Sequence, residues 1–141
     1  DASRLHDLGK IGIPDEVLQK KGTLNEQEWI LMRKHPEIGE SIIKPIRSLS
    51  HLCDVVRHHH EKLDGTGYPD GLKGDAISSL VRIATVADIY DALTSERPYR
   101  SKMSPEQACE ELRKMGGKLD QDIIETFAET LSEQRKMYPS L

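Results

Sequence analysis

The chain has 141 residues, a formal net charge of −4 and two cysteines. This length is sufficient for one domain with a buried core, and it is too short for two domains to be expected. The negative charge argues against a general nucleic-acid binder, although it leaves room for a local basic pocket that binds an anionic ligand. The cysteines fit neither a disulfide framework nor a CxxC metal site. No apolar run approaches the roughly 18 residues needed to span a bilayer, and no signal peptide is present, so we expect a cytoplasmic location.

Helical patterns follow one another along the chain, and no segment requires a strand. Residues 1–9 have the pattern of a helix, and because the chain opens inside it without a methionine we expect a piece of a longer protein. Pro14 is typical of the first position of a short helix. Thr23 and Glu26 have the spacing of a capping box ahead of the next helix, which contains the sequence WILMRKH.

The middle of the chain predicts three helices and one long irregular stretch. The first helix contains apolar residues around Ile38 at helical spacing and ends near Pro45. The second covers residues 48–63 and includes three consecutive histidines, and the third covers residues 78–95. Between the last two, residues 64–77 are expected to form a loop, which we call the glycine-rich loop.

Two further helices follow in the C-terminal part. Ser104 and Pro105 begin the first of them, which is expected to stop at Gly116. Asp120 is expected to cap the second, whose apolar face includes Phe127. The sequence therefore predicts a single all-α domain.

Three consecutive histidines on a helix cannot all face one point, because neighbouring side chains are about 100° apart. The apolar stripe that passes through Val56 places His59 and His60 on either side of the buried face. His58 shares a side with Asp54 and is expected to face solvent. Two inward imidazoles can be metal ligands or ordinary core histidines with satisfied hydrogen bonds.

Other potential metal ligands are distributed over three further helices. His6 and Asp7 are adjacent at a helix end, and an imidazole beside a carboxylate can serve two cations. His35 lies at a helix junction, where it could instead interact with a helix C-terminal dipole. Asp88 lies on the apolar side of its helix, where a carboxylate is costly unless it is paired or bound to metal. The predicted ligands of a binuclear site are His6, Asp7, His35, His59, His60 and Asp88.

The sequence resembles the HD-GYP phosphodiesterases of the HD metal-dependent phosphohydrolase superfamily. The resemblance rests on HDLGK, HHEKLDGTGYPDGLKG, VADIYDALTS and RPYR, in this order and over nearly the whole chain. It implies an HD-type helical bundle that spans residues 1–141 and lacks an upstream helix on which the family carries further ligands. It also implies that the six residues above hold two or three iron or manganese ions, and that the activity is hydrolysis of the bacterial messenger cyclic di-GMP to pGpG or GMP.

The resemblance also implies roles for single residues. Asp7 would be a bridging carboxylate and, with Lys10, a catalytic residue. Lys10 is placed to neutralise charge on the phosphoryl group or to assist the leaving oxygen, although it could be an ordinary surface lysine. Asp91, three residues after Asp88, is expected to orient a histidine by a hydrogen bond.

Substrate contacts are expected from the glycine-rich loop and from the RPYR sequence. Glycines let the loop approach other groups closely, and we expect Tyr68 to be held out from it. The resemblance implies that this tyrosine contacts a guanine base or a phosphate of the ligand. A partly packed turn tyrosine is the alternative. Arg97 and Arg100 carry guanidinium groups that suit bidentate phosphate contacts, although surface arginines are common. In the family the loop is also proposed to dock GGDEF domains, which make cyclic di-GMP.

Three functions are compatible with these features. The first is a metal-dependent cyclic di-GMP phosphodiesterase domain, preceded in the whole protein by a sensor or receiver domain. The second is a binding or scaffold module that holds the nucleotide or a GGDEF partner without turnover. The third is an HD phosphohydrolase for a related cyclic dinucleotide such as cyclic GMP-AMP. The intact set of ligands and Lys10 favours an enzyme, because a module without catalysis has no need to keep them.

Overall fold

The structure is a computed structural model that describes residues 2–96 and 101–137, and all of its longer regular elements are helices. The all-α prediction is confirmed, with one isolated β-bridge between Asp64 and Lys73 as the sole pairing of extended backbone in the described ranges. No helix in these ranges has the length and apolar character needed to cross a membrane. The α-helices are α1 (Ala2–Leu5), α2 (Asp15–Leu18), α3 (Glu26–Met32), α4 (His35–Ile43), α5 (Cys53–His58), α6 (Ser79–Thr94), α7 (Pro105–Lys114) and α8 (Gln121–Met137).

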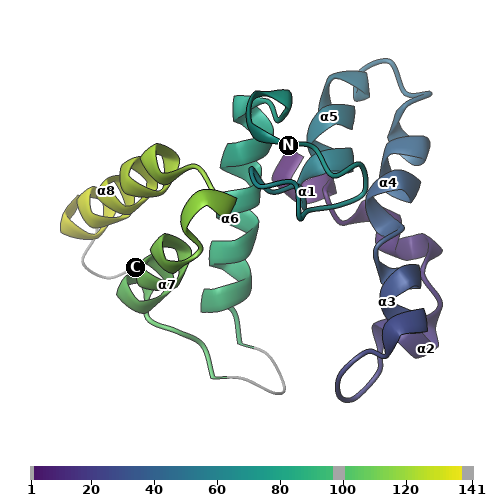
Figure 1. Cartoon of the computed structure of the whole chain (residues 1–141), viewed down its shortest axis with the longest axis horizontal. Helices are drawn as coiled ribbons and strands as arrows, with labels where there is room; N and C mark the ends of the chain where they lie inside the picture. The colour runs from purple at the N-terminus through teal and green to yellow at the C-terminus, as the bar shows by residue number, and fades with distance from the viewer. Residues whose placement is uncertain (1, 97–100, 138–141) are drawn as a thin grey trace.

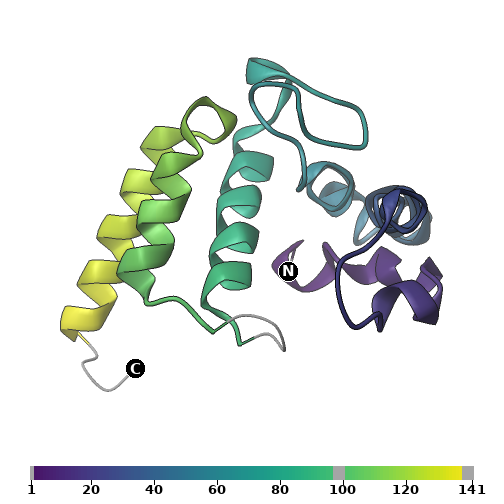
Figure 2. The same ribbon diagram turned by 60° about the horizontal axis from the view of Figure 1, so that its bottom comes forward.

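Helix α6 lies between two groups of helices, as both ribbon views show (Figures 1 and 2). On one side are α7 and α8, and on the other are α1 to α5. One buried cluster joins α6 to α7 and α8 through Val86, Leu112 and Ile124. The fold therefore has apolar contacts on both sides of one long central helix.

Helix α5 belongs to two buried clusters at once. Val56 packs with Ile43 of α4, while the next-door Val55 packs with Val81 of α6. Both valines are fully buried, and burial of such a side chain stabilises the folded state by about 1.5–3 kcal/mol. The three histidines at the end of α5 and just after it, His58, His59 and His60, therefore follow a helix that is held between α4 and α6.

A close backbone contact joins the start of the chain to α4. A Cβ atom at Gly9 would lie 1.8 Å from the carbonyl oxygen of His35 and 2.5 Å from the amide nitrogen of Gly39. Only glycine can occupy this position without displacing α4, because these neighbours are backbone atoms. The contact brings the 3-10 helix η1 (Leu8–Gly12), and the preceding Asp7, against the first turn of α4.

Several predicted helix ends are confirmed. The Ser78 side chain accepts a hydrogen bond from the amide of Val81 at the start of α6. Ser104 forms a full capping box with Gln107 at the start of α7. Asp120 Oδ1 accepts from the amide of Ile123 at the start of α8.

Other predicted boundaries are wrong. The capping box of α3 is made by Asn25 and Glu28 rather than by Thr23 and Glu26, because the Asn25 side chain is the one that reaches the amide of the third helical residue. Pro14 occupies the N-cap of α2, one position before its first residue Asp15, rather than the predicted first position.

The predicted helix at residues 48–63 is also too long. It begins as a short 3-10 turn, and α5 ends at His58. Beyond that point tertiary contacts replace helical ones: the Leu63 amide donates to the carbonyl of Lys118 in the segment before α8, and Leu63 packs in the Val55 cluster instead of continuing the Val56 stripe.

Candidate metal centre

Four side chains from three separate parts of the chain converge beside α5. Asp7 lies in the turn after α1, His35 is the first residue of α4, and His59 and His60 follow α5. Each offers one ligand atom, and these atoms all lie within 4.8 Å of one another. His35 and His59 are only 1% exposed. The predicted inward direction of His59 and His60 is confirmed by this geometry.

Hydrogen bonds to backbone carbonyls fix the tautomers of two of these histidines. Nδ1 of His35 donates to the carbonyl of Met32 at 2.8 Å, and Nδ1 of His59 donates to the carbonyl of Val56 at 2.9 Å. A carbonyl can only accept, so the proton must be on Nδ1 and the Nε2 lone pairs must point inward. The threonine hydroxyl of Thr85 on α6 also donates to the carbonyl of His59 at 2.9 Å, which fixes its backbone.

The inward nitrogens face one another at close range. His35 Nε2 lies 3.3 Å from His59 Nε2 and 3.2 Å from His60 Nε2. When both Nδ1 atoms carry their protons, the Nε2 atoms of neutral His35 and His59 are both acceptors, and two facing lone pairs repel. A shared cation removes this conflict, which is how imidazole nitrogens act as metal ligands.

Burial keeps these imidazoles uncharged. It lowers the pKa of His59 to about 4, and the neighbouring His6 and His35 add to the effect. Burial and the adjacent His59 lower the pKa of His60 to about 3. Burial likewise lowers the pKa of His35. Neutral imidazole is the form that binds metal, so the donor set fits a divalent ion at neutral pH.

Lys10 is directed at the carboxylate of Asp7. Its Nζ atom lies 2.6 Å from Asp7 Oδ2, while Asp7 Oδ1 lies 3.4 Å from His35 Nε2. Burial disfavours the charged form of Asp7, but the hydrogen bond and charge of Lys10 outweigh it and hold the pKa of this carboxyl below its usual value. Lys10 therefore contacts a predicted metal ligand, and its catalytic role stays a prediction.

His6 and Asp88 lie next to the four-residue cluster. His6 Nε2 is 3.2 Å from Asp88 Oδ1 and 3.5 Å from Asp7 Oδ2, and its ring centroid is 4.9 Å from that of His59. Burial opposes the charged form of Asp88, yet the hydrogen bond from His6 lowers the pKa of its carboxyl. All six predicted ligands thus lie in one region, and a cavity of ≈ 440 Å³ borders it, lined among others by His6, Asp88 and the exposed Asp91. The expected role of Asp91 as an orienting carboxylate stays a prediction.

Tyr68 of the glycine-rich loop lies on the metal centre. Its ring stacks on that of His60, with centroids 4.7 Å apart and an interplanar angle of 27°. Burial raises the pKa of its hydroxyl. The loop folds back over the histidines and Tyr68 is half-buried against His60, which matches the alternative of a partly packed tyrosine, while its contact with a base or phosphate stays a prediction.

Glu61, a residue that the sequence patterns did not single out, fixes that loop. This carboxylate is 2% exposed. Its Oε1 accepts from the amides of Asp70 and Gly71 at 2.7 and 3.0 Å, and its Oε2 accepts from the amide of Leu72 at 3.0 Å. The available signal was an acidic residue directly between the histidines and a glycine-rich segment. Nothing in the sequence predicts that its hydrogen-bond partners are backbone amides about ten residues later.

His58 points away from the metal centre, but it does not face solvent as predicted. Its Nδ1 lies 2.8 Å from Asp54 Oδ1 and its Nε2 lies 2.9 Å from Asp70 Oδ2. Arg57 also binds Asp70 with two nitrogens, at 2.7 and 2.9 Å, and Glu40 at 2.7 Å. These ion pairs tie the far side of the glycine-rich loop to α4 and α5.

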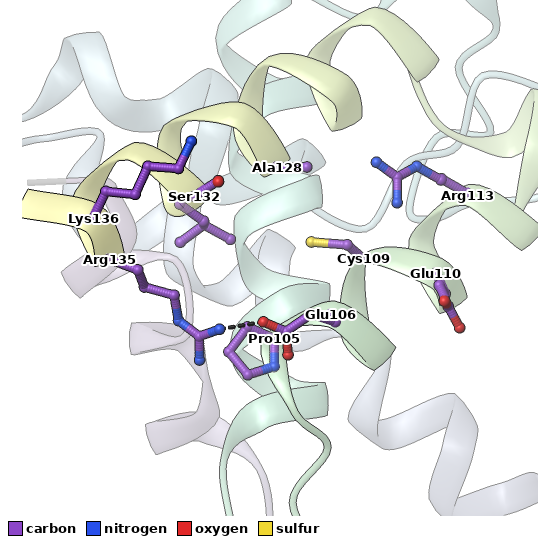
Figure 3. A pocket seen from close by; sticks show the side chains of 10 residues that line it. Pro105, Glu106, Cys109, Glu110, Arg113, Ala128, Ser132, Arg135 and Lys136 are labelled. Carbon is purple, nitrogen blue, oxygen red and sulfur yellow. Dashed lines mark hydrogen bonds and ion pairs between the residues drawn. The ribbon is translucent and has the colours of Figure 1, made fainter. Parts of the chain in front are cut away.

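The predicted phosphate-binding residues Arg97 and Arg100 lie outside the described residues. A separate groove of ≈ 440 Å³ lies between α7 and α8 (Figure 3). Its arginines have carboxylate partners, since Arg135 pairs with Glu106 and Arg113 pairs with Glu125. This groove contains none of the predicted site residues.

Comparison with known proteins gives one family and several relatives. A family model described as HD domain matches residues 2–123. A cyclic di-GMP phosphodiesterase of Pseudomonas aeruginosa is 40% identical over 131 residues, which are 92% of this chain and 32% of that protein. The 3'3'-cGAMP-specific phosphodiesterase 3 of Vibrio cholerae is 47% identical over 107 residues, covering 76% of this chain and 23% of that protein. A cyclic di-GMP phosphodiesterase of Thermotoga maritima is 39% identical over 142 residues, covering 97% of this chain and 38% of that protein.

The match over residues 2–123 means that the chain belongs to the HD domain family. The sequence Gly67-Tyr68-Pro69, in the loop that covers the histidines, makes it an HD-GYP-type domain, as the resemblance implied. The family match and the cluster of Asp7 with three histidines together indicate a divalent metal site. The chain spans less than two fifths of the length of each relative described above.

Proposed function

We propose that this chain is a metal-dependent phosphodiesterase domain that hydrolyses cyclic di-GMP to pGpG or GMP. The observation that carries the proposal is the facing Nε2 atoms of His35, His59 and His60 beside Asp7, a donor arrangement that fits a cation. The relatives named as cyclic di-GMP phosphodiesterases support the choice of substrate. Hydrolysis of a phosphodiester is a reaction for which clustered divalent ions are suited.

The six predicted ligands would hold two or three divalent ions, and iron or manganese is proposed from the resemblance to the HD-GYP phosphodiesterases; the nitrogen and oxygen donors are compatible with both. When bound, such ions supply Lewis-acid activation of a water molecule and of the phosphodiester. Asp7 would contribute a carboxylate oxygen to more than one ion. Its partner Lys10 lies 2.6 Å away, so the ammonium group can neutralise charge on a phosphoryl oxygen or donate a proton to the leaving oxygen.

The remaining residues would bind and enclose the nucleotide. Tyr68 covers His60, and its ring would limit access of bulk water on that side. Arg97 and Arg100 are proposed to contact phosphate, and Asp91 to orient a histidine. In the whole protein we also propose a cytoplasmic location, an upstream sensor or receiver domain, and docking of GGDEF domains on the glycine-rich loop.

A second candidate substrate is 3'3'-cGAMP, because a relative at 47% identity is named as specific for it. Turnover of cyclic di-GMP and of 3'3'-cGAMP should be compared on protein reloaded with iron or with manganese. Metal content should be measured in parallel by elemental analysis. Hydrolysis of cyclic di-GMP supports the proposal. Preferential hydrolysis of 3'3'-cGAMP would make that nucleotide the substrate instead. Binding without turnover by metal-loaded protein identifies a scaffold module instead.

A further inference from the structure

We propose that Trp29 and Arg33 of the α3 region form a nucleotide-recognition subsite beside the metal centre. This inference rests on the proposed function. The subsite would take the part of a cyclic dinucleotide that lies beyond the reacting phosphodiester, with Trp29 stacking on a purine base. Arg33 would donate hydrogen bonds to acceptor-rich groups, either phosphate oxygens or the guanine edge with its O6 and N7 acceptors.

A stack of side chains connects this subsite to the metal centre. Tyr68 stacks on His60 at 4.7 Å between centroids. On the ring of Tyr68 lies the guanidinium of Arg33, with its Cζ atom 5.4 Å from the ring centroid. The same Cζ atom lies 6.0 Å from the centroid of Trp29. The guanidinium is therefore one aromatic layer away from a predicted metal ligand.

Within residues 2–96 and 101–137, no acidic side chain pairs with the hydrogen-bond donors of Arg33. Arg57, another arginine near the loop, is bound to Asp70 and Glu40. Among the residues that the structure describes, no carboxylate pairs with Arg33, which is held by aromatic faces instead. A guanidinium stacked in this way keeps its five in-plane donors available for an anionic or acceptor-rich ligand.

Exposed apolar side chains lie beside the guanidinium of Arg33. Trp29 is 46% exposed and Ile30 is 55% exposed, and with Glu26 and Arg33 they line a shallow groove of ≈ 390 Å³. An exposed indole beside a guanidinium is a suitable platform for a nucleobase, since every base offers a π-face. A cyclic dinucleotide has two bases and two phosphates, and a metal centre acts on one phosphodiester at a time. The surface next to Tyr68 is in position to bind part of the remainder.

The test combines two ligands with four variants of the full chain. Dissociation constants for cyclic di-GMP and cyclic di-AMP should be measured by calorimetry on manganese-loaded wild type, Arg33→Ala, Arg33→Lys and Trp29→Ala. Arg47→Ala is the matched control, because Arg47 is also exposed and follows the far end of α4 from His35. Turnover of bis(p-nitrophenyl) phosphate, a phosphodiester without a purine, should be measured on the same proteins.

We expect Arg33→Ala to weaken cyclic di-GMP binding by about tenfold or more, which corresponds to loss of a charge-assisted hydrogen bond. Arg33→Lys should give a smaller loss, and the effect on bis(p-nitrophenyl) phosphate should be much smaller. An equal loss for both cyclic dinucleotides identifies a phosphate contact, and a larger loss for cyclic di-GMP identifies the guanine edge. Trp29→Ala should weaken both, whereas Arg47→Ala should bind as wild type does.

Two results would overturn the inference, and they are distinguishable. If the wild type binds cyclic di-GMP and both Arg33→Ala and Trp29→Ala bind it equally well, the subsite is wrong while the proposed function stands. If the wild type turns over bis(p-nitrophenyl) phosphate but binds no cyclic dinucleotide, the proposed function fails and the subsite fails with it. If Arg33→Ala lowers cyclic di-GMP binding and turnover of bis(p-nitrophenyl) phosphate by the same factor, Arg33 only supports Tyr68. That result would also overturn the inference.

Discussion

At the scale of single residues, three adjacent histidines have three different sets of partners. His59 and His60 face the nitrogens of other imidazoles, whereas His58 lies between two carboxylates. The separation follows from the rotation of about 100° between neighbours at the end of a helix. Adjacent positions in the sequence can therefore serve metal binding and loop attachment at the same time.

Replacement of each histidine by alanine should separate these two roles. His59→Ala and His60→Ala are each expected to lower bound metal and turnover, because each removes an inward nitrogen. His58→Ala should keep its metal, since its ring bonds only to Asp54 and Asp70. Elemental analysis of the three purified variants checks this. A loss of metal in His58→Ala equal to that in His60→Ala would contradict the assignment.

The pH dependence of stability should follow from the buried imidazoles. The pKa of His59 falls from its ordinary value of 6.5 to about 4. Between these two values the unfolded chain binds more protons than the folded one, so the metal-free protein should lose stability as pH falls from about 6.5 to 4. The lowered pKa of Asp7 acts in the same direction, but only below its ordinary value of 3.8.

Urea unfolding with chelator present, at several pH values between 7 and 5, measures this dependence. The His59→Gln variant is the control, because its side chain does not titrate in that window and its slope should be flatter. A free energy of unfolding that rises on acidification would show that the imidazoles are charged in the folded state.

At the scale of elements, the glycine-rich loop is fixed by one buried carboxylate. Glu61→Gln replaces an oxygen that accepts a backbone amide with an NH2 group that cannot. We expect a loss of about 1–3 kcal/mol in the free energy of unfolding, since a buried amide loses its acceptor. Faster hydrogen exchange at Asp70, Gly71 and Leu72 should accompany it. The exposed Glu129 offers a control, and unchanged exchange in Glu61→Gln would contradict this role.

The contact between η1 and α4 gives a second prediction at this scale. Gly9→Ala would place a methyl group 1.8 Å from the carbonyl oxygen of His35, so the two elements must separate. Overpacking of this kind costs about 1–3 kcal/mol, and the separation also moves Asp7 away from His35. Unfolding curves and metal titrations should therefore both change. Gly117→Ala is the control, because nothing lies within 4 Å of a Cβ atom there, and a Gly9→Ala variant as stable as this control would refute the contact.

Local signals predicted these elements better than long-range ones did. The helix starts at Ser104 and Asp120 were predicted because a capping side chain bonds within three residues of itself. The end of α5 and the position of Tyr68 were not, since they depend on partners far along the chain. Tyr68 contacts Arg33, and the helices α4 and α5 lie between these two residues in the sequence. No periodicity in the sequence predicts a contact over such a separation.

At the scale of the whole molecule, the metal centre lies where several elements meet around α5, and two apolar clusters hold these elements together. The predicted ligands come from the turn after α1, from α4, from the end of α5 and from α6. The sequence predicted these residues because carboxylates and imidazoles on apolar faces are costly without a partner. Their mutual arrangement needed the Gly9 contact and the Val55 and Val56 clusters, which only the folded chain reveals.

Metal binding should therefore raise the free energy of unfolding of the whole molecule. The added protection should differ between helices. A ligand that binds only the folded state adds about 2.7 kcal/mol when its free concentration is a hundred times its dissociation constant. We expect manganese to raise the midpoint of thermal unfolding and a chelator to lower it, with no shift in a His59→Ala, His60→Ala double variant. Hydrogen exchange should slow most in α4, α5 and η1, which the ions would tie together, and least in α7 and α8, which pack on the other side of α6 (Figure 1). Equal slowing in α7, α8 and α4 would mean that the stabilisation is not local to the proposed ligands.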